Sequence, residues 1–292
     1  MTVKNVELVL SPPDPHFVGD GFRVHNFIPG GYRTGMERMN PFILLDYGAK
    51  FYFPPSDRPL GVGVHPHRGF ETVTIAYKGR VAHHDSTGQS GVIGEGDVQW
   101  MTAASGILHK EYHEKKFSEE GGELQMVQLW VNLPARYKMS QPKYQSITNS
   151  QIGRVSLENG AGTVEVIAGG YKNVNGAATT FSPIHLFSVR LNKKGSAGFS
   201  FPALYNTALL VIEGKITING TEEVPTDNFA LFENEGEDFE LVSEAGAVVL
   251  IMSGEDIQEP IAAHGPFVMN TRQEILQAFE DFQKGKFGYL KD

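Results

Sequence analysis

The chain of 292 residues contains no cysteine. Disulfides, thiolate catalysis and cysteine-ligated zinc or iron–sulfur sites are therefore excluded, and any bound metal must take nitrogen and oxygen ligands. Long apolar runs are also missing, since no segment approaches the roughly 20 residues that span a bilayer. The N-terminus lacks the successive charged, apolar and small-residue regions of a signal sequence. We therefore expect a cytoplasmic protein that does not bind membranes.

Positive charge is in deficit. The 25 Lys and Arg residues are outnumbered by 34 Asp and Glu, so the formal charge is −9 and the isoelectric point is near 5.6. Nonspecific binding to nucleic acid relies on basic side chains that neutralise phosphates, so direct contact with nucleic acid is not expected. The 33 glycines and 16 prolines indicate many tight turns, which favours β architecture over helix bundles.

Six of the ten histidines lie in one window, residues 61–113. His65 and His67 form an H-x-H, and His109 and Glu111 form an H-x-E. Residues i and i+2 of a β-strand project to the same face, so two such strands side by side would bring four donors to one point. Imidazole and carboxylate together suit iron, copper, nickel or zinc. The window therefore predicts a metal site.

Three other histidines of this window are left out of the predicted ligand set. His83 and His84 are adjacent, so in a strand they face opposite ways and cannot both join the cluster. His84 with Asp85 could hold a turn or orient the metal ligands. His113 is the third residue left out.

The remaining sequence contains two rounds of one β-rich design. ETVTIAYKGRVAHH predicts a hairpin with its turn at Lys78-Gly79, and TALLVIEGKITING repeats the pattern around Gly214. When the two turn glycines are aligned, residues without an imidazole or carboxylate stand at the positions of the candidate metal ligands of the first round. The second round should therefore hold no such metal. The residues at the positions of His65, His67 and Glu71 are Ser200, Pro202 and Asn206.

This repetition predicts two domains. We expect them at residues 1–135 and 152–292, with a polar linker at 136–151. Thr271 and Glu274 form a capping-box signature, and apolar residues then recur at helical spacing. The second domain should therefore end in a helix at about 271–284, which we expect to dock on a barrel.

Several of these segments resemble the pirin family, a branch of the cupin superfamily. The motifs that carry the resemblance are HPHRGFETVTI, HDSTG, GDVQWMTA, GILHKE, NPFILLDYG and EPIAAHGPFVMNT. The resemblance implies an all-β fold of two tandem cupin barrels (jelly rolls, or double-stranded β-helices) with a C-terminal helix. The first barrel would hold the metal.

The resemblance also bears on the carboxylate ligand. The general cupin pattern places a glutamate after H-x-H, which corresponds to Glu71, whereas the pirin pattern uses the glutamate of H-x-E, which corresponds to Glu111. We follow the pirin pattern, so the expected ligands are His65, His67, His109 and Glu111, with Glu71 as the alternative. The loop at Ala104-Ser105-Gly106 departs slightly from the glycine-rich form of the family.

Open coordination positions beside histidine and carboxylate ligands are typical of non-haem metal enzymes that activate O₂. The resemblance implies dioxygenase cleavage of a flavonol such as quercetin, with loss of carbon monoxide, and Glu111 would accept the hydroxyl proton. Fe(II) is the expected ion, and copper, nickel, zinc, manganese and cobalt are alternatives.

Two other functions stay open. Pirins are also associated with binding transcription regulators or metabolic enzymes, a role in which the metal would be a redox or structural centre and the partner a protein. A metal-stabilised or storage-like cupin would perform no chemistry.

Overall fold

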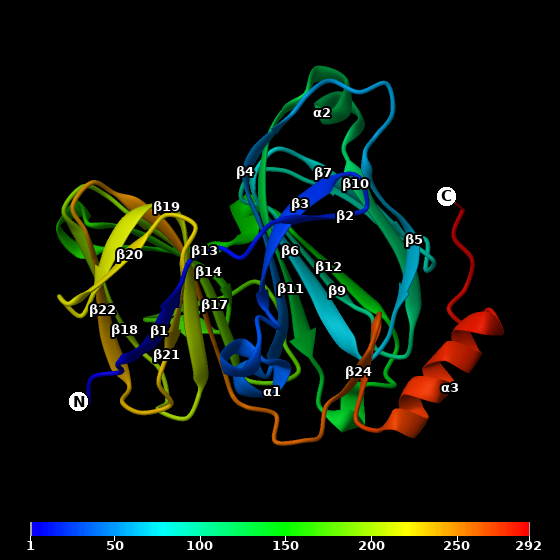
Figure 1. Ribbon diagram of the computed structural model, residues 1–292. Coiled ribbons are helices and arrows are strands. Elements are labelled where there is room, and N and C mark those ends of the chain that lie inside the picture. Colours follow the sequence, from blue (N-terminus) through cyan, green and yellow to red (C-terminus); the bar gives the residue numbers. More distant parts are fainter. Residues whose placement is uncertain (1, 292) are drawn as a thin grey trace. The chain divides into compact units, whose positions relative to one another are not determined.

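The computed structural model describes residues 2–291, which divide into two compact units. The N-terminal barrel, as we call the first, contains Pro13–Glu37, Pro41–Asn149 and the residues from Ile257 onward. The C-terminal barrel contains the residues up to Pro12, Arg38–Asn40 and Ser150–Asp256. Strands predominate in both units, as Figure 1 shows, and the fold is all-β with two cupin domains and one C-terminal helix.

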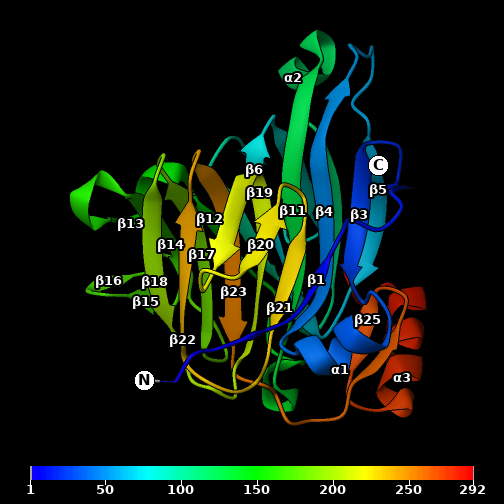
Figure 2. The same cartoon turned by 60° about the vertical axis from the view of Figure 1, so that its left-hand side comes forward.

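Two sheets enclose the interior of the N-terminal barrel. The larger sheet has the order β12 (Lys143–Ile147), β9 (Val98–Thr102), β6 (Phe70–Lys78), β11 (Gly122–Asn132), β4 (Phe42–Phe53), β3 (Phe22–Ile28) and β2 (His16–Val18). The smaller sheet has the order β5 (Gly61–His67), β10 (Ile107–His113), β7 (Val81–Asp85) and β8 (Ser90–Ile93). Figure 2 shows β11, β4 and β3 side by side in the larger sheet.

The C-terminal barrel has a corresponding arrangement. Its main path is β1 (Val6–Leu10), β21 (Phe229–Phe232), β19 (Asn206–Ile218), β23 (Ala247–Gly254), β17 (Ile184–Leu191), β14 (Gly162–Ala168) and β13 (Gly153–Ser156). The strands off this path are β18 (Gly195–Ser200), β20 (Glu222–Pro225) and β22 (Asp238–Ser243). Strand β22 pairs with β18 and with β19, and β20 pairs with β19.

Short elements complete the structure. The two-stranded pairs are β15 (Gly170–Tyr171) with β16 (Val174–Asn175), and β24 (Ala262–His264) with β25 (Phe267–Met269). The helices are α1 (Met36–Met39), α2 (Lys115–Glu120) and α3 (Arg272–Gln283), and the 3-10 turns are Tyr32–Thr34, Ala135–Tyr137, Asn149–Gln151 and Glu158–Gly160.

The predicted hairpin around Gly79 is wrong. The turn exists, and Gly79 has a φ of 80°, which glycine adopts without steric cost. However, β6 pairs with β9 and β11, whereas β7 pairs with β10 and β8. Both edges of β6 are already occupied, so the chain passes from the larger sheet to the smaller one at this turn.

The segment that was expected to be a linker contains a strand. Residues 143–147 form β12, the edge strand of the larger sheet, in antiparallel register with β9. Edge strands carry polar residues because one side is open to solvent, and this polarity hid the strand in the sequence. The difference matters for the site, because β12 supplies Tyr144.

Helix α3 begins as the sequence predicts. The Thr271 side chain accepts from the Glu274 backbone N–H, and the Glu274 carboxylate accepts from the Thr271 backbone N–H, which completes the capping box. The helix belongs to the N-terminal barrel, whereas the sequence placed it with the second domain. Its apolar face packs with Leu108 and Val64 of β10 and β5, and in Figure 1 it lies beside β5.

A buried ion pair fixes this helix. Nη1 of Arg68 donates to the Asp281 carboxylate at 2.9 Å, and both side chains are at most 8% exposed. The Arg68 guanidinium also lies over the Phe287 ring, 4.7 Å from its centroid, and Nε donates to the Ser105 carbonyl. Arg68 directly follows His67, so the helix is anchored next to a candidate ligand.

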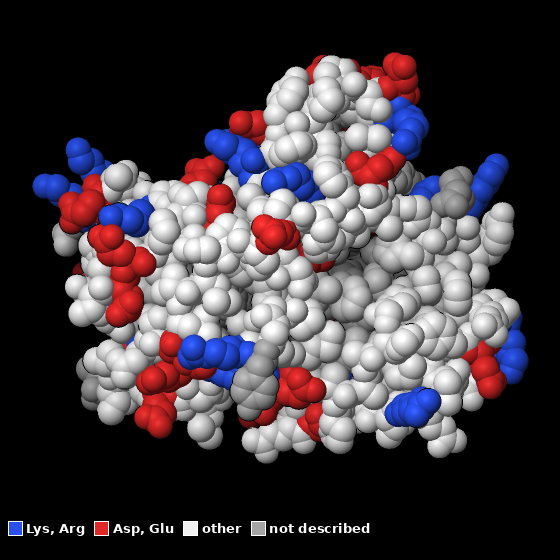
Figure 3. All heavy atoms as spheres, in the orientation of Figure 1, with Lys and Arg blue, Asp and Glu red and all other residues white. Residues whose placement is uncertain are grey.

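Among the described residues, no helix is long and apolar enough to cross a membrane. On the face shown in Figure 3, basic and acidic side chains are interspersed, and no extended basic patch is visible there.

We predict that Asp281→Ala lowers the free energy of unfolding by about 3–5 kcal/mol, because it leaves the Arg68 charge buried without its partner. Denaturant unfolding measures the change. The matched control is Glu280→Ala, which removes an exposed ion pair with Lys284 and should cost less than about 1 kcal/mol. Equal small losses in both variants would contradict the prediction.

Candidate metal centre

The pairing of β5 with β10 brings three imidazoles together. In the antiparallel register His65 lies directly opposite His109, and His67 lies opposite Ile107, so the three side chains share the inner face. One nitrogen from each ring lies within 4.8 Å of the others, and the ring centroids are 4.2–4.8 Å apart. Among residues 2–291 this is the one group of three such side chains that could hold a metal ion.

The ring nitrogens have few other partners. His67 is 4% exposed and His109 is fully buried, yet Nδ1 of His67 and both nitrogens of His109 make no hydrogen bond. Nδ1 of His65 donates to the Gly63 carbonyl at 2.8 Å, which leaves its Nε2 free and fixes the ring. Buried polar atoms without partners are costly. This donor set therefore fits a divalent cation.

Burial also sets the protonation of the imidazoles. Loss of solvation lowers the pKa of His67 and of His109 well below the usual value, and the charge on His65 adds to the effect. A histidine can bind a metal only through an unprotonated nitrogen. Both buried rings are therefore neutral near pH 7, as ligation requires.

Glu111 lies on the same face of β10 as His109 and is 4% exposed. Its carboxylate accepts hydrogen bonds from Thr74 Oγ1 at 3.2 Å and from Gln128 Nε2 at 2.8 Å. Burial raises the pKa of Glu111, and the Gln128 hydrogen bond, the charge on His65 and the Thr74 hydrogen bond partly offset this rise. The carboxylate is thus held in place by the larger sheet.

Glu71 is a different case. Glu71 is three residues before Thr74 on β6, and the pairing of β6 with β9 shows no bulge over this stretch. Side chains alternate along a strand, so the Glu71 side chain projects to the face opposite that of the Thr74 hydroxyl. It accepts from Thr102 Oγ1 at 2.7 Å, away from the imidazoles. The carboxylate that shares the inner face with the imidazoles is therefore that of Glu111, and Glu71 belongs to another polar contact.

The other histidines separate as the sequence suggests. His83 and His84 face opposite ways: His83 shares a hydrogen bond with the Tyr144 hydroxyl, whereas His84 bonds to Tyr112 and stacks on its ring. Nε2 of His113 donates to the Gly21 carbonyl. Asp85 holds a turn, as expected, because its Oδ1 accepts from the backbone N–H of Thr87.

Sequence reasoning missed the residues that surround the centre. Thr74 and Gln128 could have been found, because each is a polar residue in a strand that is otherwise mostly buried and apolar. Tyr144 gave no signal, since its segment was assigned to the linker. Trp130 stacks on Phe70 at 4.2 Å, and its ring lies 5.2 Å from that of His67, which places a flat aromatic wall next to the imidazoles.

The C-terminal barrel carries a different set at the corresponding positions. His83 and Ile218 each follow their turn glycine by four residues, and their cross-strand partners are Glu111 and Leu241. Phe199 lies opposite Phe239, just as His65 lies opposite His109. The residues equivalent to the four predicted ligands are therefore Phe199, Phe201, Phe239 and Leu241.

This register corrects the alignment of the two rounds. The sequence comparison placed Ser200 and Pro202 at the positions of His65 and His67. The second round has one more residue between this motif and the turn glycine, and a slip of one residue moves every side chain to the other face of a strand. Phenylalanine and leucine offer no atom that could bind a metal ion. The prediction that the second barrel holds no such metal therefore rests on these residues and not on Ser200 and Pro202.

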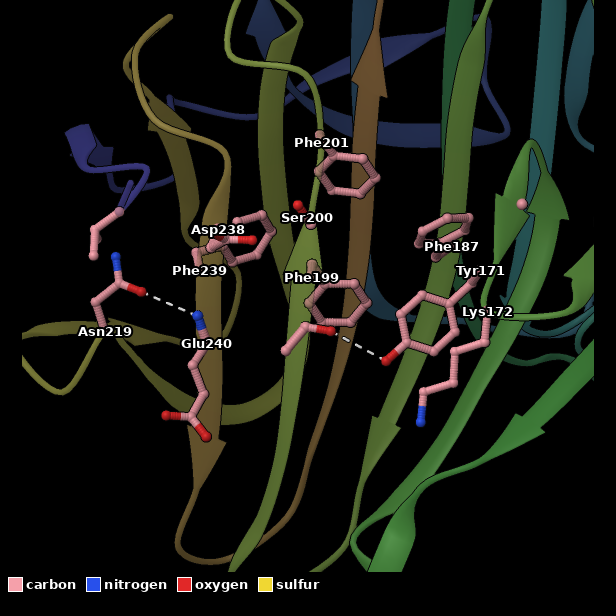
Figure 4. A pocket seen from close by; sticks show the side chains of 13 residues that line it. Tyr171, Lys172, Phe187, Phe199, Ser200, Phe201, Asn219, Asp238, Phe239 and Glu240 are labelled. Carbon is pink, nitrogen blue, oxygen red and sulfur yellow. Dashed lines mark hydrogen bonds between the residues drawn. The ribbon is translucent and has the colours of Figure 1, made fainter. Parts of the chain in front are cut away.

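A cavity of about 590 Å³ lies beside these rings. Figure 4 shows Phe199, Phe201 and Phe239 gathered at it, with Lys172 and Glu240 on either side. The three rings are at most 4% exposed. Phe199 stacks on Phe201 and on Phe239, with 5.5 Å between the centroids of Phe199 and Phe239. Phenylalanine rings offer no atom that could bind a metal ion, so the candidate metal site is the histidine cluster of the N-terminal barrel.

Comparisons with known proteins agree with the fold. The family model described as Pirin matches residues 21–131, and the model for the Pirin C-terminal cupin domain matches residues 186–288. A Pseudomonas aeruginosa protein named "Putative quercetin 2,3-dioxygenase" is 46% identical over 285 residues, which cover 98% of this chain and 99% of the relative.

Solved structures show the same likeness. A crystal structure of quercetin 2,3-dioxygenase from Acinetobacter baumannii has a TM-score of 0.92 and 43% identity, and the match covers 99% of each chain. A bacterial pirin from Escherichia coli in complex with nickel(II) has a TM-score of 0.64 over 85% of this chain and all of its own. At 16% identity the second likeness shows the shared fold.

We predict that Glu71 makes the metal-free protein less stable as the pH rises. Burial raises the pKa of Glu71 to about 7, above its unfolded value, so its contribution is complete below the unfolded pKa and is lost as the pH rises through about 7. Between pH 5 and pH 8 the wild type should lose about 2–3 kcal/mol relative to Glu71→Gln.

Denaturant unfolding at both pH values measures this difference. Glu95→Gln is the control, because Glu95 is exposed and its removal should leave the pH dependence unchanged. The same pH dependence in Glu71→Gln and in the wild type would show that the buried carboxyl is not responsible.

Proposed function

This chain belongs to the pirin family, and from that membership and the histidine cluster we propose that it is a metal-dependent dioxygenase that cleaves flavonols. The observation that carries the proposal is the cluster itself: three converging imidazoles with unpartnered buried nitrogens. The buried carboxylate of Glu111 lies two residues from His109 on the same face of β10, outside this group of three. The quercetin 2,3-dioxygenase names of the relatives at 46% and 43% identity support the substrate class.

We assign His65, His67 and His109 as metal ligands, with Glu111 as the fourth. When bound, a divalent metal would supply Lewis-acid and O₂-activating chemistry at this centre. The donor set suits Fe(II), which we favour, and it also suits the other first-row ions named above. The nickel(II) in the Escherichia coli pirin supports metal binding by this fold family and leaves the choice of ion to measurement.

Glu111 is our candidate for the catalytic base. A flavonol must lose its hydroxyl proton to become electron-rich enough to react with O₂, and a carboxylate within hydrogen-bond reach can accept that proton. Burial raises the pKa of Glu111 and so brings it closer to the working pH, which makes the carboxylate a better proton acceptor. Gln128 and Thr74 hold the two carboxylate oxygens, so their role is to orient the base.

The aromatic wall suits a planar substrate. Trp130 and Phe70 are stacked with an interplanar angle of 27°, and the Trp130 ring lies next to that of His67. A flat polyphenol could stack on this surface with its hydroxyl toward the imidazoles, since offset stacking of aromatic rings is favourable.

We predict that His109→Ala and His65→Ala each weaken metal binding by at least about 100-fold, because a ligand is lost outright and even residues that only orient ligands are worth 10–100-fold. Metal analysis of the protein after equilibration with Fe(II) measures this. His84→Ala is the control, since His84 faces away from the cluster, toward Tyr112, and should keep its metal. Full metal occupancy in His65→Ala and His109→Ala would remove these residues from the ligand set.

We predict that the iron-loaded wild type consumes quercetin and O₂ and releases carbon monoxide. The loss of the flavonol absorbance in air measures this reaction. Gln128→Ala should retain metal but lower kcat by about 10-fold or more, because it releases one oxygen of the candidate base from its donor and misorients it. Glu71→Gln, whose carboxyl lies on the other face of its strand, should stay fully active.

The alternative function makes the opposite prediction. A regulatory pirin that binds transcription factors or metabolic enzymes would hold its metal and leave quercetin unchanged. No turnover by fully metal-loaded protein would therefore contradict the dioxygenase proposal and favour a binding role.

A further inference from the structure

A second polar group lies on the inner face of the N-terminal barrel, beside the imidazole cluster. Strand β7 pairs with β10 so that His83 lies directly opposite Glu111, and Asp85 lies directly opposite His109. Directly opposed residues in an antiparallel pair share one face, with Cβ atoms about 5 Å apart. His83 and Asp85 are therefore the cross-strand neighbours of two candidate ligands.

Each of these two side chains has one atom without a partner. His83 is 1% exposed and Asp85 is 3% exposed, and neither Nδ1 of His83 nor Oδ2 of Asp85 makes a hydrogen bond. The other atoms are fully used. Oδ1 of Asp85 accepts from Thr87 and Gln89 in the turn, and Nε2 of His83 shares its bond with the Tyr144 hydroxyl.

The two unfilled atoms have complementary hydrogen-bonding roles. The Tyr144 hydroxyl shares a hydrogen bond with Nε2 of His83. When this hydroxyl donates to Nε2, the single proton of a neutral imidazole lies on Nδ1. One donor and one carboxylate acceptor then lie on one face of β7, at the same i, i+2 spacing at which His65 and His67 of β5 face one point.

A neighbouring glycine leaves the space that the His83–Tyr144 pair occupies. Gly91 of β8 lies opposite His83, and a Cβ at this position would lie 2.8 Å from His83 Nε2 and 3.5 Å from the Tyr144 hydroxyl. Any larger residue would push the ring or its partner aside. The imidazole orientation is thus set from three sides, by β8, β10 and β12.

We propose that His83 Nδ1 and Asp85 Oδ2 form a hydroxyl-binding subsite next to the metal centre, filled by water in the free protein and by a second hydroxyl of the substrate. A hydroxyl group accepts one hydrogen bond and donates another, so it matches this donor and this acceptor at once. A ligand without a hydroxyl there would leave a buried ring nitrogen and a carboxylate oxygen unpaired, which is costly. The subsite therefore selects polyhydroxylated flavonols over flavonols with a single hydroxyl.

A third residue extends the same argument. Gln99 is fully buried, and neither polar atom of its side-chain amide has a partner. It lies opposite Thr74 in the pairing of β6 with β9, and the Thr74 hydroxyl donates to Glu111. The inner face thus offers further unfilled polar atoms, which favours a hydroxyl-rich ligand over an apolar one. The substrate half of the proposal rests on the proposed function, whereas the water half does not.

The first test is a high-resolution crystal structure of the metal-loaded protein without substrate. We expect one ordered water within hydrogen-bond distance of both His83 Nδ1 and Asp85 Oδ2. A direct bond between these two side chains, or an empty space between them, would overturn the proposal. This outcome does not depend on whether the protein acts on flavonols.

The second test measures binding of quercetin and of 3-hydroxyflavone, which lacks the other hydroxyls, to metal-loaded protein without O₂. The wild type should bind quercetin more tightly. Asp85→Asn keeps the turn-capping oxygen but replaces the acceptor by a donor, so it should weaken quercetin binding about 10-fold and 3-hydroxyflavone binding less than about 2-fold. His83→Phe, a second variant, removes the donor and should give the same selective loss.

Asp97→Asn is the matched control. Asp97 also holds a turn, through the Gly94 and Asn149 backbone N–H groups, but it takes no part in the subsite, so both affinities should be unchanged. Equal loss of both ligands in Asp85→Asn at full metal occupancy would show a merely structural role and overturn the proposal. If the wild type binds neither flavonol, the proposed function fails and the water in the crystal structure alone decides the subsite.

Discussion

The register between β5 and β10 is the constraint on which the candidate site depends. It places His65 opposite His109 and so turns two sequence motifs into one cluster. A slip of one residue would move every side chain of β5 to the outer face. The register also buries imidazole nitrogens of His67 and His109 that find no protein partner, and this cost is offset when a cation is bound.

The two faces of these strands have separate tasks. The inner face carries the imidazoles and Glu111, while the outer face carries Val64 and Leu108, which pack under α3 and the residues that follow it. The pair Arg68–Asp281 anchors that helix directly next to His67. The C-terminal segment therefore stabilises the strands that carry the candidate ligands, which explains why it belongs to the N-terminal barrel.

The two barrels show how one β design supports different interiors. Equivalent positions hold imidazoles and a carboxylate in the first, and three phenylalanines and a leucine in the second. In the first barrel, polar groups such as Gln99 and His83 are buried with unfilled hydrogen-bonding atoms, a state that favours a polar ligand. In the second, the aromatic rings and the leucine at these positions offer no atom that could bind a metal ion.

The local features of the fold follow from the order of the amino acids alone. The i, i+2 spacing of His65 and His67, and of His109 and Glu111, required each pair to share a face, because successive side chains of a strand alternate. The adjacency of His83 and His84 likewise sent them opposite ways, and Thr271 with Glu274 set the start of the terminal helix. The motifs of the metal window were specific enough to identify the pirin family, with its all-β fold of two cupin barrels.

Which strands pair with one another is known only from the three-dimensional fold. Strand pairing depends on contacts between residues far apart in the chain, and a local pattern such as that around Gly79 fits a hairpin as well as a crossing between sheets. For the same reason the sequence could not reveal that Gln128 and Thr74 hold Glu111, that Glu71 faces away from the imidazoles, or that Tyr144 of a polar edge strand reaches His83. Side-chain periodicity is a property of a single segment, whereas the register of one segment against another is a property of the fold.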